Sequence, residues 1–277
     1  MKNENKLIVL ESSRPVGVFD SGIGGLTVLK ALRQHFPKES FIYLGDTARL
    51  PYGTKSPETV IKYAESLTQE LLNHDVKAIV IACNTASTHA LHAVTQLAPH
   101  LPVIGMIEPA ASAATQNTKN NHIAVMGTFG TIKSNVYLKA IQRLRPDIKI
   151  SSVPCQMLVA LAEEGWTNDS IAKDTLHRYL DAIFDSLNPP DTLILGCTHF
   201  PLFLPLLKDI LGPAVGFINS GEVASLTLKN YLKDSKDDIL GTLQFLVTDD
   251  PIRFAENASK FYDDKISIKD ITLIDIR

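Results

Sequence analysis

The feature that most constrains the fold is an approximate repeat, in which short apolar segments alternate with amphipathic helical segments in both halves of the chain. The apolar segments have the length and residue types of buried strands. They lie at 16–19, 41–44, 78–82 and 103–106 in the first half, and at 123–126, 149–153, 192–196 and 215–218 in the second. Strands that alternate with helices form mostly parallel sheets with helices on both faces. We therefore predict an α/β fold of two similar, pseudo-symmetric domains.

The helical segments of the two halves also correspond. The segment LKALRQHFP that begins at Leu29 matches the segment LKAIQRLRP that begins at Leu138. Ser56, followed by proline and glutamate, has the pattern of a helix start, and the helix predicted at about 169–187 takes the equivalent place in the second half. Any two α/β domains match this loosely, so the inference depends on the shared order of elements and on the cysteines at equivalent positions.

The length of the chain, 277 residues, suits two domains better than one core. The second series of elements is complete by Ile218, and the tail that follows adds further helices and strands. We expect this tail to return to the first domain. The predicted first domain comprises residues 1–106 plus 221–277, the second comprises residues 107–220, and the active site lies in the cleft between them.

Composition excludes several classes of protein. The formal net charge is −3, without the basic excess of a nucleic-acid-binding surface, so no direct nucleic-acid partner is expected. No apolar run reaches the ~18 residues that a membrane span needs, and Met1 to Leu10 lacks the apolar core of a signal peptide. We therefore expect a cytoplasmic protein without a membrane partner. Three widely spaced cysteines argue against a disulfide framework and form no zinc pattern, so they are predicted to be free thiols.

Two of these cysteines, Cys83 and Cys197, follow equivalent predicted strands, and each precedes polar residues and a helix. Ligands of parallel sheets bind at the carboxyl ends of strands, where helix N-termini favour anions. The same field is expected to lower the pKa of a thiol from ~8.5 toward neutrality. Either thiol alone is best explained as a packed core residue, but two at equivalent strand ends favour reactivity. Cys155 has no such neighbours and is predicted to be structural.

A pseudo-twofold pair of domains presents its two thiols to a ligand from opposite sides. A racemase needs this arrangement, because one base removes the Cα proton and an acid on the other face returns one. Other polar residues also follow strands, and each has a simpler structural explanation as a turn or a helix cap. They are Asp20 and Ser21 in a glycine-rich turn, Tyr52 with Gly53, and Thr128. Glu163 lies in a helical stretch and would ordinarily belong to a solvated face.

Five motifs together resemble the glutamate racemases of the wider aspartate/glutamate racemase superfamily, in the right order and over nearly the whole chain. They are FDSGIGGLTVL (19–29), DTARLPYG (46–53), IACNTAS (81–87), MGTFGTIKS (126–134) and GCTHFPL (196–202). The resemblance implies two α/β domains, no metal or pyridoxal cofactor, and interconversion of L- and D-glutamate for cell-wall peptidoglycan. It also implies a homodimer, and it leaves open an allosteric peptidoglycan precursor.

Residue by residue, the resemblance makes Cys83 and Cys197 the two catalytic acid/base groups. Asp20 and His199 assist the thiols, and Glu163 supports the histidine. The substrate contacts implied by the same comparison are Asp20, Ser21, Tyr52, Gly53, Asn84, Thr85, Thr128, Thr198 and His199. Asn219 departs from the family, whose members often have aspartate there, and this departure bears on the hinge rather than on catalysis.

Three alternatives remain open at this point. Aspartate racemases usually carry Glu rather than His after the second Cys-Thr pair, so Cys197-Thr198-His199 favours glutamate, whereas hydantoin racemases and maleate isomerases lack the Asp-Ser-Gly turn. A two-lobed binding protein would share the fold but not need paired thiols. Some members of the family restrain DNA gyrase, and nothing in the sequence decides such a regulatory role.

Overall fold

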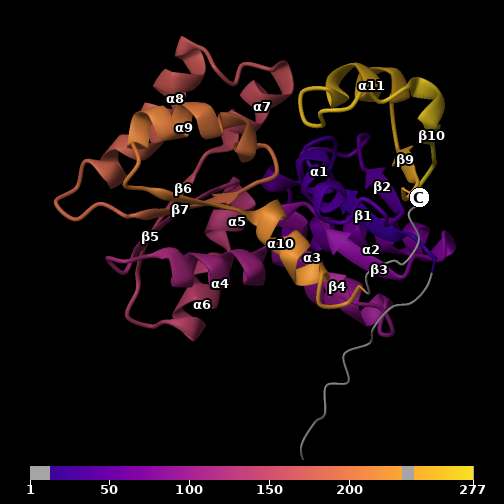
Figure 1. The fold of residues 1–277 in the computed structure, drawn as a ribbon, viewed down its shortest axis with the longest axis horizontal. Coiled ribbons are helices and arrows are strands. Elements are labelled where there is room, and N and C mark those ends of the chain that lie inside the picture. The colour runs from indigo at the N-terminus through magenta and orange to yellow at the C-terminus, as the bar shows by residue number, and fades with distance from the viewer. Residues whose placement is uncertain (1–12, 233–239, 277) are drawn as a thin grey trace, which may run out of the picture.

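The computed structural model describes residues 13–232 and 240–276, and the expectation about Met1 to Leu10 falls outside these residues. The chain forms two lobes, each built on one parallel sheet (Figure 1). The first lobe is defined here by the sheet with strand order β10-β9-β2-β1-β3-β4. Its strands are β1 (Val16–Asp20), β2 (Phe41–Gly45), β3 (Ala78–Ile81), β4 (Val103–Ile104), β9 (Leu243–Val247) and β10 (Ile271–Leu273).

The second lobe is defined by the sheet with strand order β6-β5-β7-β8. Its strands are β5 (His122–Gly127), β6 (Lys149–Pro154), β7 (Thr192–Gly196) and β8 (Gly216–Asn219). Every neighbouring pair of strands in both sheets is parallel. The order β2-β1-β3-β4 in the first lobe repeats as β6-β5-β7-β8 in the second. The predicted α/β fold with two similar parallel sheets is thus confirmed, and β9 and β10 of the tail extend the first sheet.

Helices cover both sheets, and their starts carry the caps that the sequence indicates. Ser56 accepts a hydrogen bond from the Thr59 amide at the start of α2, and Asp169 caps α8 in the same way through the Ala172 amide. The α-helices of the described residues are α1 (Leu26–His35), α2 (Pro57–Asn73), α3 (Asn84–Leu97), α4 (Ile107–Asn117), α5 (Phe129–Lys133), α6 (Val136–Leu144), α7 (Gln156–Glu164), α8 (Ser170–Phe184), α9 (Leu204–Leu211), α10 (Ser220–Leu228) and α11 (Pro251–Ala258). Short 3-10 helices are η1 (Tyr52–Thr54), η2 (Phe200–Phe203) and η3 (Ile268–Asp270).

Two of these helices carry the chain from one lobe to the other. Helix α4 follows the last strand of the first series and packs on α6 in the second lobe, whereas α10 follows the last strand of the second series and packs on α1. In Figure 1, α10 lies where the two lobes meet. The sequence pattern does not predict α4, because its buried face consists mainly of small residues and lacks large apolar side chains at helical spacing. Those small residues include Ala110, Ala111 and Ala114.

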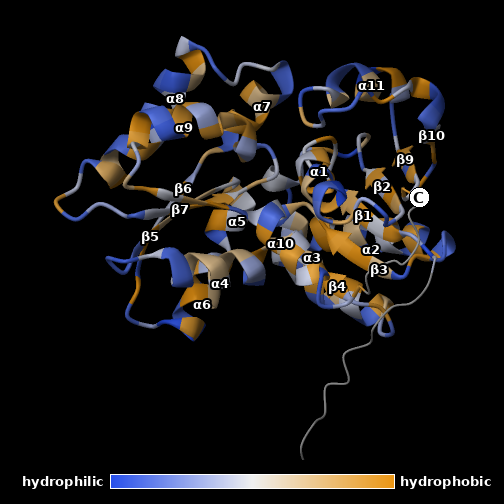
Figure 2. Ribbon diagram, viewed as in Figure 1, coloured by the Kyte–Doolittle hydropathy of each residue, from blue (hydrophilic) through white to orange (hydrophobic). Residues whose placement is uncertain are grey.

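The core is apolar and lies between the sheets and the inner faces of the helices. Strands and inward helix faces are hydrophobic in Figure 2, while the hydrophilic residues lie on outer helix faces and loops. The strands β1, β3, β5 and β7 are buried throughout, as expected for parallel strands that are covered on both faces. Of the helices in the part of the chain that the structure describes, none has both the length and the hydropathy to cross a membrane.

Candidate active site

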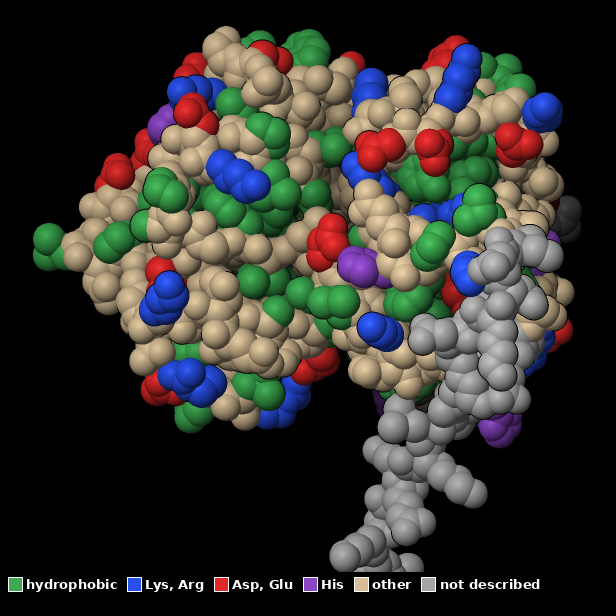
Figure 3. Space-filling view, in the orientation of Figure 1, with side chains coloured by type: hydrophobic (Ala, Val, Ile, Leu, Met, Phe, Trp, Pro, Cys, Tyr) green, Lys and Arg blue, Asp and Glu red, His purple; other side chains and the backbone are tan. Residues whose placement is uncertain are grey.

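The two predicted thiols meet at one cavity between the lobes. Cys83 follows β3 and caps the start of α3, and Cys197 follows β7 at the equivalent place in the second lobe. Each is 7% exposed, and both line the same cavity. The surface view in Figure 3 shows the two lobes side by side with notches between them. The repeat therefore places the cysteines where the sequence indicates, at the carboxyl ends of corresponding strands.

Most of the other predicted site residues surround this cavity. From the first lobe come Ser21, Tyr52, Gly53, Asn84 and Thr85, and from the second come Thr128, Glu163, Thr198 and His199. Asp20 is not among the lining residues and lies buried behind the turn. Five lining residues were not predicted as site residues, namely Gly22, Leu50, Pro51, Gln156 and Val159. Leu50 and Pro51 belong to the DTARLPYG motif, which could have indicated them, whereas Gln156 and Val159 carry no such signal.

The cavity is narrow. Its volume is about 20 Å³, which is room for about one water molecule. Contacts between the lobes border it. Thr85 of α3 and Thr128 at the start of α5 share a hydrogen bond of 2.9 Å between their hydroxyl oxygens. Gly53 packs so closely on Thr128 that an added Cβ would lie 2.7 Å from the threonine Cβ, so only glycine fits there.

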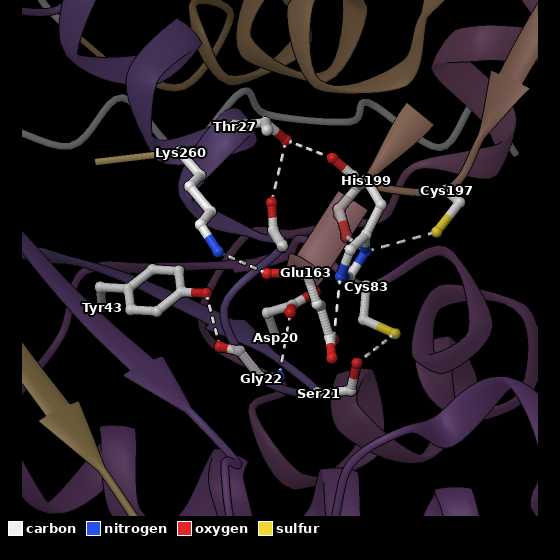
Figure 4. Close-up of polar contacts among 12 residues, drawn as sticks. Asp20, Ser21, Gly22, Thr27, Tyr43, Cys83, Glu163, Cys197, His199 and Lys260 are labelled. Carbon is white, nitrogen blue, oxygen red and sulfur yellow. Dashed lines mark hydrogen bonds and ion pairs between the residues drawn. The ribbon is translucent and has the colours of Figure 1, made fainter. Parts of the chain in front are cut away.

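Burial has the largest effect on the pKa of the Cys83 thiol. The thiol lies 3.6 Å from the Ser21 hydroxyl (Figure 4). Its sulfur also accepts a hydrogen bond from the Ala86 amide at 3.4 Å. Burial and the charge of Asp20 raise the pKa of Cys83 to about 12, although the Ala86 and Ser21 hydrogen bonds oppose the change. The expectation that the helix N-terminus lowers this pKa toward neutrality is therefore wrong for Cys83, because desolvation of the thiolate outweighs one backbone N–H group.

Cys197 instead belongs to a line of three polar side chains. Its sulfur lies 3.7 Å from Nδ1 of His199, and Nε2 of that histidine lies 3.2 Å from Oε1 of Glu163 in α7 (Figure 4). Burial alone would lower the pKa of His199, but its hydrogen bonds to Cys197 and Glu163, together with the charges of Cys197 and Asp20, raise it to about 10. The imidazole is thus a cation at neutral pH, beside the sulfur of Cys197. The ring also meets the edge of Phe261 at 5.4 Å between centroids.

The glycine-rich turn after β1 is fixed by its own polar contacts. Asp20 accepts a hydrogen bond from the Gly22 amide at 3.0 Å, and the Tyr43 hydroxyl donates to the Gly22 carbonyl at 2.9 Å (Figure 4). Burial raises the pKa of Asp20, against the opposing charge of His199 and the N–H groups of the turn. Oδ1 of Asp20 is buried and has no hydrogen-bond partner among the described residues. This carboxyl group acts on the Cys83 thiol through its charge rather than through a direct bond.

The loop after β2 brings Tyr52 and Gly53 to the cavity, and a buried carboxylate holds this loop in place. Asp46 accepts hydrogen bonds from the Tyr52 hydroxyl, from Arg49 at 2.9 Å and from the Thr248 hydroxyl at 2.9 Å. Burial and the nearby Asp46 charge raise the pKa of Tyr52 far above its usual value, so its proton stays on the phenol. Tyr52 therefore lines the cavity as a neutral aromatic side chain.

Cys155 has a different environment, as its sequence context indicates. It is fully buried, and its thiol lies 3.6 Å from the Val153 carbonyl oxygen. It is not among the residues that line the cavity. Within residues 13–232 and 240–276, the His, Cys, Asp and Glu side chains form no group of three or more that could hold a metal ion.

The fold and the site define a class of protein, in which two similar α/β lobes bring two thiols to one enclosed cavity. A family model described as Asp/Glu/hydantoin racemase matches residues 26–225. The curated glutamate racemase of Geobacter metallireducens is 40% identical over 257 residues, which cover 91% of this chain and 94% of that protein.

Two solved structures are similar over most of the chain. The glutamate racemase of Francisella tularensis in complex with D-glutamate has a TM-score of 0.86 at 36% identity, and the match covers 95% of this chain and 98% of that one. The Escherichia coli glutamate racemase in complex with L-glutamate and the activator UDP-MurNAc-Ala has a TM-score of 0.73 at 29% identity, with 88% and 92% covered. The chain therefore belongs to the Asp/Glu/hydantoin racemase family. The predicted family resemblance is confirmed, and the chain is an isomerase that racemises amino acids.

Proposed function

We propose that this enzyme interconverts L- and D-glutamate by moving one proton at Cα, with Cys83 and Cys197 as the two acid/base groups. The observation that carries the proposal is the pair of thiols at equivalent strand ends of two similar lobes, both at one enclosed cavity. Glutamate is favoured as the substrate because the curated relatives and the solved structures named above are glutamate racemases. The product D-glutamate would supply peptidoglycan synthesis.

The reaction needs one thiolate and one thiol. The thiolate removes the Cα proton and becomes a thiol, while the opposite thiol gives its proton to the other face of Cα and becomes a thiolate. The two enantiomers exchange these roles. Because the Cα proton is weakly acidic, donors that are already in place around the substrate carboxylate must stabilise the enolate-like charge. Ser21, Asn84, Thr85 and Thr198 are the proposed donors and acceptors, and exclusion of water strengthens their contacts.

The remaining side chains set the charge of the thiols. We propose that the His199 cation stabilises the thiolate of Cys197, and that Glu163 holds the imidazole in place. On the other side, Cys83 is a neutral thiol in the ligand-free cavity and hence an acid. The α-ammonium group of bound glutamate brings a positive charge that favours its thiolate, so substrate binding itself prepares Cys83 as a base. Asp20 acts on both thiols through its charge, while Tyr52, Gly53 and Thr128 shape the pocket.

Replacement of either thiol tests the two-base scheme. Cys83→Ala and Cys197→Ala should each lose racemisation, a fall of at least about 10²-fold, because one face of Cα then has no acid or base. Circular dichroism of D- and L-glutamate solutions measures the rate. In D₂O, the product of the wild-type enzyme should carry deuterium at Cα. Cys155→Ala is the matched control, and it should remain active because its thiol lies outside the cavity. Ordinary turnover by either active-site variant would refute the two-base scheme. Turnover of aspartate but not of glutamate would refute the proposal that glutamate is the substrate.

The division into domains is proposed as residues 1–106 with 221–277 and residues 107–220. Membership of the strands in the two sheets and the crossovers at α4 and α10 support it.

We also propose a homodimer and activation by a peptidoglycan precursor, the latter because the similar Escherichia coli structure holds such an activator. Sedimentation and addition of UDP-MurNAc-Ala to the assay test these two points. The cytoplasmic location stays a prediction.

A further inference from the structure

The side-chain amide of Asn84 connects the two lobes beside the catalytic thiols. Asn84 is the first residue of α3, directly after Cys83. Its Nδ2 donates hydrogen bonds to the hydroxyl of Tyr137 in α6 at 2.9 Å and to the hydroxyl of Ser220 in α10 at 3.3 Å. All three side chains are at most 3% exposed. The amide of a first-lobe residue is thus held by one helix of the second lobe and by the crossover helix.

The direction of these hydrogen bonds is fixed by the group at their far end. The Ser220 hydroxyl donates its only proton to the Leu195 backbone carbonyl at 2.9 Å, and a carbonyl oxygen can only accept. The Ser220 oxygen must therefore accept from Tyr137, whose hydroxyl lies 3.3 Å away. The Tyr137 oxygen, having given its proton to Ser220, accepts from Asn84. Burial raises the pKa of Tyr137 to about 12, against the hydrogen bonds of Ser220 and Asn84, so the phenol keeps its proton at neutral pH.

These hydrogen bonds form a relay from Asn84 through Tyr137 and Ser220 to the Leu195 carbonyl. The relay determines which end of the Asn84 amide is free. Because Nδ2 faces Tyr137 and Ser220, the carbonyl oxygen Oδ1 occupies the other branch of the amide. Oδ1 is buried and lacks a hydrogen-bond partner among the described residues, and Asn84 lines the catalytic cavity. A buried acceptor without a partner is costly, at about 1–3 kcal/mol. The α-ammonium group of an amino acid is a donor only, and it can satisfy this oxygen.

We propose that Tyr137 and Ser220 are positioning residues, which fix the Asn84 amide so that its carbonyl oxygen accepts a hydrogen bond from the α-ammonium group of the substrate. The inference rests on the proposed function for the identity of the amino acid. Without the relay the amide can rotate, and its N–H group would then face the ammonium group and repel it. The relay ends at Leu195 on β7, two residues before Cys197. Closure of the lobes and the orientation of the amide are therefore coupled.

Two ligands that differ in the ammonium group test the relay. D-Glutamate carries the group, and glutarate has the same two carboxylates without it. In Tyr137→Phe the dissociation constant of D-glutamate, measured by calorimetry, should rise about tenfold, as expected for one weakened hydrogen bond to a charged group. The dissociation constant of glutarate should be unchanged. Ser220→Ala should give the same selective loss. Ser225→Ala is the matched control, because Ser225 is a buried, hydrogen-bonded serine of the same helix outside the cavity.

The outcomes separate the relay from a structural role and from the proposed function. Equal weakening of both ligands, or no change in either, would overturn the relay, provided that the melting temperature shows a folded variant. Should Tyr137→Phe be unfolded, Ser220→Ala decides by the same ratio. If the wild-type enzyme does not racemise glutamate while the selective loss persists, the proposed function fails and the relay stands. If the wild type racemises glutamate and neither variant shows a selective loss, the relay fails and the proposed function stands.

Discussion

The two thiols have different environments, although their places in the fold are equivalent. Cys83 lies beside a buried carboxylate, which together with burial raises its pKa to about 12. Cys197 lies beside a histidine that is a cation up to about pH 10. In the ligand-free enzyme the first is thus a neutral thiol, and the second lies next to a cationic side chain. The pseudo-symmetry of the backbone is therefore not matched by symmetry of charge.

The pH dependence of activity tests the Glu163–His199 contact. Glu163→Gln removes a charge that helps to raise the pKa of His199, so the imidazole should lose its proton at a lower pH. The basic limb of the kcat/KM profile should therefore move down by about one pH unit. Glu164→Gln, at an exposed neighbour on the same helix, is the matched control. An unshifted basic limb in Glu163→Gln would contradict the role given to Glu163.

The same contact has a consequence for stability. The folded pKa of His199 lies above its value in the unfolded chain, so its contribution is fully present below about pH 6.5. It is lost as the pH rises through about 10. The free energy of unfolding in urea should thus fall by a larger total amount between these pH values in the wild-type enzyme than in Glu163→Gln.

At the scale of elements, the turn between β1 and α1 meets the loop after β7. An added Cβ at Gly24 would lie 2.5 Å from Nδ1 of His199 and from the Thr198 hydroxyl oxygen, both in the second lobe. Gly24→Ala should therefore limit how far the lobes close, and lower kcat/KM by about tenfold or more. The melting temperature should change little, because the overlap disappears when the lobes separate. Gly105→Ala, whose Cβ would have ordinary contacts at 3.4 Å, is the control. Normal activity of Gly24→Ala would mean that this contact is absent in catalysis.

The elements also show what the sequence could predict. Apolar strands and capped helices, such as α2 with Ser56, follow from local patterns, and the repeat placed Cys83 and Cys197 at matching strand ends. Helix α4 was missed because alanines hide its periodicity. The predicted pKa of Cys83 was wrong because the thiol is buried in a cluster with side chains distant in the sequence, such as Leu44 and Tyr52, which no local pattern reveals. Gln156 was missed because only the assembled lobes bring it to the cavity, where its side-chain oxygen lies near Gly53.

At the scale of the whole molecule, the cavity volume requires motion. Room for about one water molecule cannot hold an amino acid, so the lobes must move apart for glutamate to enter. The tail provides one contact that opposes this opening. Lys260, which follows α11, donates a hydrogen bond from Nζ to the Glu163 backbone carbonyl at 2.8 Å (Figure 4). It connects a segment that packs on the first lobe to α7 of the second.

Rapid-mixing kinetics can measure the opening step. If opening limits entry, the observed rate of D-glutamate binding should reach a plateau as its concentration rises. Lys260→Met keeps an apolar side chain of similar length but removes the hydrogen bond, so it should raise the plateau about two- to fivefold, as expected for ~0.5–1 kcal/mol. Lys30→Met is the matched control, because it removes an exposed lysine whose partner, Asp263, lies in the same lobe. A rate that rises linearly to the highest concentrations would contradict gating by the lobes. An equal effect of Lys260→Met and Lys30→Met would show that the Lys260 hydrogen bond does not control the opening step.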